Sequence, residues 1–199
     1  MTRPYRLKKR AERQEETRLR IVEAAIALHT AVGPAHTTVS AIAEKAGVER
    51  HTYYRHFPEE RDLLNGCSGL YMERNPLPDP ADWREIADPR KLLQHGLKDL
   101  YVYYEANEAM LANIVRDAEV HPLTREMFEI HAAPQLGAIG ATLAEVLPGA
   151  RRRSTQAALE LALDFNTWRL LVRRSGLSTS QAAELMAATL SCVGSASAA

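Results

Sequence analysis

A chain of 199 residues is long enough to bury the core of one large domain or of two small ones. Its formal charge is zero overall, but residues 1–65 carry 12 Lys+Arg against 9 Asp+Glu, and residues 66–199 carry 13 against 16. Its two cysteines, Cys67 and Cys192, lack metal-ligand spacing, so we expect reduced thiols and no metal site. Neither an 18-residue apolar run nor a signal-peptide pattern is present, so we expect a cytoplasmic protein with no membrane span.

The chain is predicted to begin with a basic arm and a first helix. Cationic side chains are concentrated ahead of that helix: Arg3, Arg6, Lys8, Lys9, Arg10 and Arg13. Such an arm could lie along DNA phosphates or enter a minor groove, and a solvated, disordered tail has the same composition. Apolar residues spaced three and four apart then predict a helix from about Glu15 to Ala31, which Gly33 and Pro34 end.

The segment Thr37–Phe57 has the pattern of a helix-turn-helix. Its first helix has one apolar face, made of Val39, Ile42, Ala43 and Ala46. Thr38 is placed to cap this helix, and Gly47 supplies the left-handed backbone of the turn. The second helix, Glu49–His56, is crowded with hydrogen-bonding side chains, which suit phosphates and base edges better than a core.

A longer stretch, TTVSAIAEKAGVERHTYYRHFPEERDLL, resembles the DNA-binding signature of the TetR family of bacterial transcriptional regulators. The resemblance runs from about Ile21 to Leu64, and its most specific parts are the IA-x-x-AGV turn and the T-x-Y-x-HF close. We therefore expect a helix-turn-helix DNA-binding domain in residues 1–65 and an effector-binding and dimerisation domain in residues 66–199.

The resemblance also implies a role for each polar residue of the segment. Positions that usually contact phosphates are occupied by Thr38, Tyr54 and His56. Positions that read bases are occupied by Arg50, His51 and Thr52. Arg55 either contacts a phosphate or is simply solvated, and Tyr53 falls where the family usually has a leucine, so we expect it in the core.

One position departs from the family pattern. The family commonly has a phosphate-binding lysine three residues after the His-Phe pair, and Glu60 stands there in this chain. Arg61 follows directly and could take over the contact. The sequence leaves both possibilities open for this anchor.

The rest of the chain has a wholly helical pattern. A fourth helix is expected from about Glu59 to Glu73, followed by a proline-rich loop with a short helical turn around Trp83. Further helices are expected at about 90–106, 108–120, 124–147 with a kink or division at Pro134, 154–174 and 178–192. No segment alternates as a strand would, so we predict an all-α fold with about nine helices.

The last two helices are predicted to form an antiparallel hairpin and a dimer interface. They are amphipathic, and residues 159–170 have more apolar surface than one core needs. In the TetR family the last two helices commonly pair with their copies, and a twofold dimer spaces two recognition helices about one DNA turn (roughly 34–36 Å) apart. We expect a homodimer through residues 154–192 that binds a palindromic double-stranded operator.

The resemblance implies a small-molecule effector that binds the C-terminal domain and disfavours the operator-binding geometry. Candidate effector-binding residues are Tyr104, Asn113, Arg116, Asp117, Phe165 and Trp168. Each has a simpler explanation as well, because aromatic residues at helical spacing usually form core and adjacent Arg and Asp often form an ion pair. Without a cationic or an acidic cluster in this region, a mid-sized and mostly apolar effector is expected.

Signatures of catalysis are absent from the sequence. It has neither the Glu-x-x-His pairs of di-iron bundles nor a zinc H-E-x-x-H, a G-x-S-x-G or a phosphate-binding glycine loop. We predict no catalytic residue, no cofactor and a repressor that its effector releases from DNA. The alternative is a helix-turn-helix activator or an architectural DNA-binding protein with no small-molecule ligand.

Overall fold

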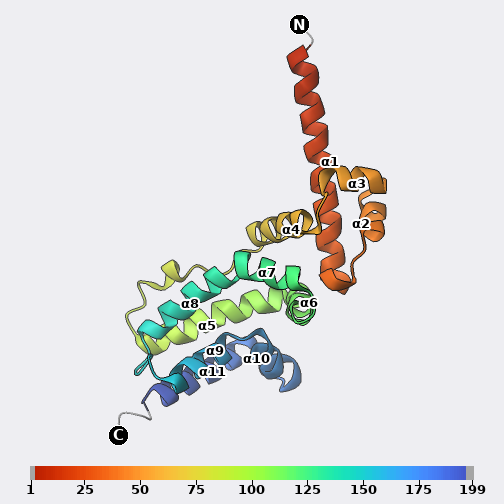
Figure 1. The fold of residues 1–199 in the computed structure, drawn as a ribbon. Helices are drawn as coiled ribbons and strands as arrows, with labels where there is room; N and C mark the ends of the chain where they lie inside the picture. The colour runs from red at the N-terminus through yellow and green to blue at the C-terminus, as the bar shows by residue number, and fades with distance from the viewer. Residues whose placement is uncertain (1–2, 196–199) are drawn as a thin grey trace. The chain divides into compact units, whose positions relative to one another are not determined.

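The computed structural model describes residues 3–195, which fold into eleven α-helices and three short helical turns and contain no strand (Figure 1). The all-α prediction is confirmed. The count exceeds the predicted nine because two expected helices are each divided in two. Over the same residues, none of the helices is both long enough and apolar enough to cross a bilayer.

These helices form two compact units. The head unit contains the chain up to Arg74 together with Ala112–His131, and the bundle unit contains Asn75–Leu111 and the chain from Ala132 onward. The packing therefore does not divide at residue 65, because the fourth helix and a second, distant segment belong to the head unit. The functional division at residue 65 stays a prediction.

The head unit is built on one long helix, α1 (Arg3–Val32). A short turn, η1 (Pro34–His36), leads to α2 (Val39–Ala46), α3 (Arg50–His56) and α4 (Glu60–Arg74), and the later segment adds the end of α6 (Glu108–Ala118) and α7 (Pro122–His131). Figure 1 shows α2 and α3 beside α1. Their shared core is formed by Ile21, Val22, Ala24, Ala25, Ile42, Ala43, Ala46, Tyr53, Phe57, Leu63 and Cys67.

Helix α1 begins far earlier than the predicted first helix. Its described backbone is helical from Arg3 onward, so the basic arm continues the helix instead of forming a separate tail. Residues 8–16 are all Lys, Arg, Glu, Gln or Ala, which are strong helix formers, and this explains the extension.

The bundle unit packs α5 (Pro89–Ala106) against α9 (Arg153–Leu163) and α11 (Thr179–Ser195), with α8 (Ala133–Glu145) beside α5 (Figure 1). The predicted helical turn around Trp83 is present as η2 (Pro80–Trp83). Trp83 is fully buried, and its Nε1 donates a hydrogen bond to Asp99 Oδ2 at 2.9 Å. The break near Pro134 is also present, since α7 ends at His131 and α8 starts at Ala133.

The expected helix over residues 154–174 is wrong in one respect, because it breaks at Asp164. This residue is extended (φ −75°, ψ 130°), and its Oδ1 accepts a hydrogen bond from Thr167 N at 3.0 Å, which caps α10 (Phe165–Arg169). The π-helical turn η3 (Leu170–Arg174) follows. The hydroxyl groups of Tyr101 and Tyr104 donate to the carbonyls of Ala162 and Leu163, which the break leaves without helical partners.

Candidate DNA-binding interface

The helix-turn-helix is held by a cap and a left-handed turn. Thr38 Oγ1 accepts a hydrogen bond from Ala41 N at 3.2 Å, so the predicted cap of α2 is confirmed. Gly47 adopts φ 64° and ψ 42°, and its amide bonds to the last carbonyls of α2. The chain therefore reverses at the predicted glycine, where a Cβ would be strained.

Helix α3 has one buried face and one polar face. Tyr53 and Phe57, four residues apart, are only 2% and 1% exposed, so the prediction that Tyr53 packs in the core is confirmed. The residues expected to meet DNA lie mostly outside: Arg50, His51, Tyr54 and Arg55 are exposed, and Thr52 is half-buried. The aromatic pair fixes the helix to the core and leaves its polar side chains accessible.

The two predicted phosphate contacts on α3 differ in their surroundings. Tyr54 is 46% exposed, and its ring packs edge-on against that of Tyr53 with centroids 5.3 Å apart. His56 is half-buried, and within the described residues its Nε2 is buried without a hydrogen-bond partner. Burial, followed by the nearby charges of Arg55 and Arg18, lowers the pKa of His56.

Both residues at the unusual anchor position have partners in the structure. Arg61 forms a bidentate pair with Glu126, with Nη2 2.7 Å from Oε2. Glu60 Oε1 lies 3.4 Å from His121 Nε2. A phosphate contact by Arg61 therefore requires that its guanidinium leave Glu126.

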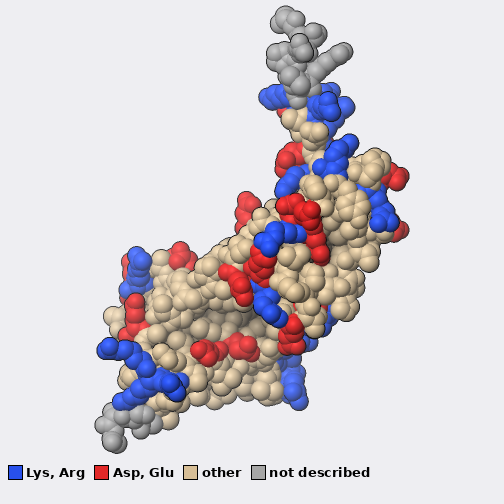
Figure 2. Space-filling model, in the orientation of Figure 1, with Lys and Arg blue, Asp and Glu red and all other residues tan. Residues whose placement is uncertain are grey.

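Basic side chains also follow the outer part of α1. Lys8, Lys9, Arg10 and Arg13 are exposed there, and Figure 2 shows this concentration of Lys and Arg on the N-terminal part of the helix. Farther along, Arg20 Nη1 donates to Ala46 O at 3.2 Å and ties α1 to the end of α2. The charge of α1 thus extends beyond the helix-turn-helix itself.

The six candidate effector residues are divided between the two units. Tyr104, Phe165 and Trp168 form an aromatic cluster in the bundle unit, with ring centroids 5.5–6.2 Å apart. Trp168 is fully buried, and among the described residues its Nε1 has no hydrogen-bond partner. The other three lie on the part of α6 that belongs to the head unit.

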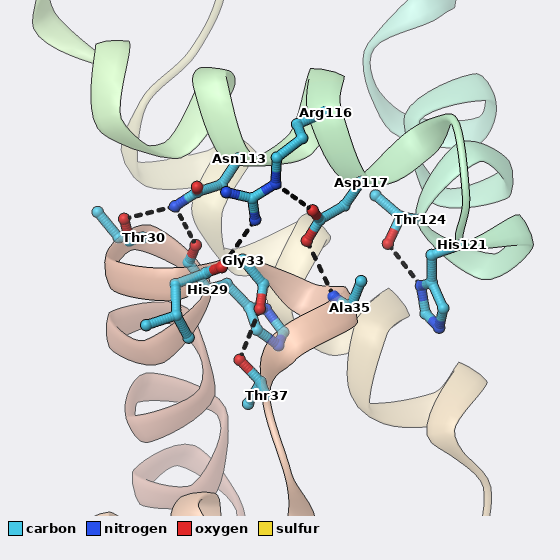
Figure 3. A network of polar contacts seen from close by, with 11 residues as sticks. His29, Thr30, Gly33, Ala35, Thr37, Asn113, Arg116, Asp117, His121 and Thr124 are labelled. Carbon is cyan, nitrogen blue, oxygen red and sulfur yellow. Dashed lines mark hydrogen bonds and ion pairs between the residues drawn. The ribbon is translucent and has the colours of Figure 1, made fainter.

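Asn113, Arg116 and Asp117 bind the end of α1 and the turn that follows it (Figure 3). Asn113 Nδ2 donates to the carbonyls of His29 (3.0 Å) and Thr30 (2.8 Å). Arg116 Nη2 donates to Val32 O at 2.7 Å. These donors satisfy carbonyls that the end of a helix leaves free. In this structure all three side chains bond to backbone groups of the head unit.

Asp117 is the buried carboxylate of this network. Its side chain is 0% exposed, accepts from Ala35 N at 2.9 Å and pairs with Arg116 Nε at 2.7 Å. Burial alone would raise the pKa of Asp117, but the hydrogen bonds from Arg116 and Ala35 outweigh it and hold the pKa below its ordinary value. Sequence spacing offered one signal for this role, since positions 113, 116 and 117 share a helix face.

Comparison with known proteins identifies the helix-turn-helix region. The family of bacterial regulatory proteins described as the tetR family matches residues 21–67. A 70-residue segment is 42% identical to the HTH-type transcriptional regulator SrpR of Pseudomonas putida, covering 35% of this chain and 32% of that protein. The chain thus matches about a third of the length of this curated relative.

Solved structures resemble the chain over most of its length. A putative TetR-family regulator from Mesorhizobium loti has a TM-score of 0.63 at 17% identity, covering 91% of this chain and 98% of that one. A TetR transcription regulator from Haloarcula marismortui has a TM-score of 0.60 at 18% identity, covering 92% and 98%. The multidrug binding protein EbrR, complexed with imidazole, has a TM-score of 0.59 at 22% identity, covering 87% and 93%. At these identities the similarity shows a shared fold.

Proposed function

Because its N-terminal part belongs to the tetR family of bacterial regulatory proteins, we propose that this protein is a cytoplasmic transcriptional regulator that binds a palindromic DNA operator as a homodimer. The observation that carries the proposal is the division of α3 into two faces. Tyr53 and Phe57 anchor the helix in the core, while Arg50 and Tyr54 remain accessible. A rigid helix with a polar outer face suits a major groove.

The residues of this face have distinct proposed roles. Bases are read by Arg50, His51 and Thr52, and Arg50 can form the bidentate contact to guanine O6 and N7. Phosphates are contacted by Thr38, Tyr54 and His56, with Arg55 as a further cation beside them. The exposed cations of α1, from Lys8 to Arg13, add sequence-independent attraction.

The dimer interface is proposed for residues 154–192 of the bundle unit. Leu161 on α9, Leu170 on η3 and Leu185 on α11 are 46–56% exposed, so apolar side chains are available on this segment for a partner to cover. A second copy related by a twofold axis would cover them and pair the two heads with the two halves of a palindrome. Light scattering of a monomer at micromolar concentration would contradict this assignment.

The effector site is proposed for the aromatic cluster of the bundle unit. Tyr104, Phe165 and Trp168 give an apolar surface, and the unbonded Nε1 of Trp168 is a donor that an effector could use. A mostly apolar effector fits this cluster, and EbrR, a multidrug binding protein, has the same fold. Asn113, Arg116 and Asp117 are proposed to act indirectly, because their polar groups bind the end of α1.

Selection of bound sequences from random duplex DNA tests the central proposal. We expect enrichment of one palindrome, with affinity that falls steeply as salt rises. Absence of any enriched sequence at low salt would overturn it.

Transcription from a promoter that carries the enriched palindrome separates a repressor from the alternative functions. A repressor lowers transcription from that promoter, whereas an activator raises it. An architectural protein would bind many unrelated sequences equally.

A further inference from the structure

A cavity lies within the head unit, where the end of α1 and η1 face α2, α3 and α4. Its volume is about 320 Å³. This is near the lower end of the range for ligand sites, and about twice the volume of an engineered cavity of roughly 150 Å³ that binds benzene. Most of its lining is apolar: Pro34, Val39, Ile42, Phe57, Pro58, Leu63 and Leu64.

Two buried polar side chains line the cavity without protein partners. His29 is 5% exposed and Tyr53 is 2% exposed. Across the described part of the chain, neither the imidazole of His29 nor the hydroxyl of Tyr53 has a hydrogen bond. Among the described residues, the buried side-chain atoms without a hydrogen-bond partner do not include those of His29 and Tyr53, so the polar atoms of these two residues reach the solvent of the cavity, where a ligand can take the place of water.

Both groups are neutral at physiological pH. Burial lowers the pKa of His29 to about 4, and burial raises the pKa of Tyr53 to about 12. Each can therefore donate or accept a hydrogen bond. The hydroxyl of Thr37, also on the lining, already donates to Gly33 O at 2.8 Å.

The rim of the cavity carries the Glu60 carboxylate, which also lies 3.4 Å from His121 Nε2. Its exposed lining residues are Tyr54, Pro58 and Glu60, and the Glu60 side chain is 54% exposed. Neither lysine nor arginine is among the lining residues. An anion would gain nothing here, whereas a cation would meet the Glu60 carboxylate.

We propose that this cavity is a second ligand site, in the head unit, for a small planar aromatic molecule that carries a cationic hydrogen-bond donor, such as an amidinium or an aromatic ammonium. The ring lies among the apolar side chains, the polar end bonds to Tyr53 and His29, and the positive charge faces Glu60. The site is separate from the aromatic cluster proposed for the effector, which belongs to the bundle unit.

Occupation of this cavity also bears on DNA binding. Tyr54 lines the rim and is a proposed phosphate contact, so a ligand beside its ring competes with the operator. This consequence rests on the proposed function, whereas ligand binding itself does not. The two are therefore measured separately.

Titration of the full-length protein with benzamidine, phenol and benzoate, followed by two-dimensional amide NMR, tests the site. We expect saturable shifts at lining residues with benzamidine, weaker saturation with phenol and none with benzoate. Shifts that stay absent or rise without saturation at millimolar benzamidine would mean that the cavity holds water only. Equal binding of benzoate would overturn the role of Glu60.

Two substitutions sharpen the result. Tyr53→Phe keeps the ring and removes the hydroxyl, and should weaken the binding of benzamidine and of phenol about threefold to tenfold. Glu60→Gln should weaken the binding of benzamidine by a similar factor and leave the binding of phenol unchanged. Glu59→Gln, an exposed neighbour outside the lining, is the matched control and should change neither. Unchanged affinity in both test variants would overturn the proposal, whatever the outcome of DNA binding.

Discussion

The carboxylate of Asp117 on α6 accepts a hydrogen bond from the amide of Ala35 at 2.9 Å, although the two residues are 82 positions apart. The same carboxylate pairs with Arg116, which also bonds to Val32 O at the end of α1. One buried acid thus fixes the turn that connects α1 to the helix-turn-helix (Figure 3). The orientation of α2 depends on a segment that the chain supplies much later.

Asp117→Asn should lower the free energy of unfolding of the head unit by about 1.5–3 kcal/mol at neutral pH, the range for hydrogen bonds to a charged group. Because the folded pKa of Asp117 is lowered, this stabilisation is present above the ordinary value of 3.8 and is lost as pH falls through the lowered pKa. Urea unfolding of both proteins at neutral and acid pH measures the difference. Asp82→Asn, at an exposed position, is the control and should have little effect at either pH.

Gly33→Ala should destabilise the head unit more than Gly176→Ala destabilises the bundle. Both glycines have positive φ, 96° and 74°, so each substitution strains the backbone by about 1–3 kcal/mol. A Cβ at Gly33 would also collide with the side chains of Arg116 and Asp117, whereas a Cβ at Gly176 meets open space. Thermal unfolding measures the stability lost in each variant. Equal losses of stability would show that the side chains of Arg116 and Asp117 can move aside for the added methyl group without destabilising the head unit.

His29 should make stability depend on pH between about 6.5 and 4. Burial lowers its pKa in the folded state to about 4 from the ordinary value of 6.5, so between these values only the unfolded state takes up the proton. The free energy of unfolding should therefore fall by about 1.4 kcal/mol per pH unit as the pH drops through this window. Urea unfolding of wild type and His29→Gln measures this pH dependence. The other histidines contribute equally to both proteins, so their contribution cancels in the difference between the two free energies of unfolding. A constant difference across the window would show that His29 protonates freely in the folded protein.

Local signals in the sequence were sufficient to predict the helix-turn-helix of the head unit. The apolar spacing of α2, the cap at Thr38 and the turn at Gly47 all act over a few residues, and each is present as predicted. The burial of Tyr53 followed from its position in the family pattern. The division of the helix at Pro134 likewise follows from a single residue whose ring excludes continuous helix.

Distant contacts were not predictable in the same way. Asn113, Arg116 and Asp117 read as polar positions near an effector, yet their partners are backbone groups some 80 positions earlier, which no local pattern records. The break at Asp164 depends on hydroxyl donors from Tyr101 and Tyr104 on another helix. Both features arise from tertiary packing, which overrides helix propensity.

Glu126→Gln should increase affinity for DNA by releasing Arg61. In the structure the Arg61 guanidinium is paired with the Glu126 carboxylate, which competes with any phosphate. Neutralising that carboxylate should tighten binding and make the salt dependence steeper by about one counterion. Fluorescence anisotropy at several salt concentrations measures both quantities. Glu129→Gln removes the same charge from an exposed position on the same helix, so equal effects in the two variants would assign the gain to net charge alone.

Substitutions on α3 should separate base reading from phosphate binding. Arg50→Ala should cost about 1–3 kcal/mol on the preferred operator and relax the preference at one base pair, because a bidentate contact to guanine is lost. Tyr54→Phe removes one phosphate hydrogen bond, so it should weaken binding to all sequences about equally. Competition binding with operators changed at single positions distinguishes the two patterns. If Arg50→Ala instead weakened binding to every sequence alike, Arg50 would be a phosphate contact. The base-reading residues would then be His51 and Thr52.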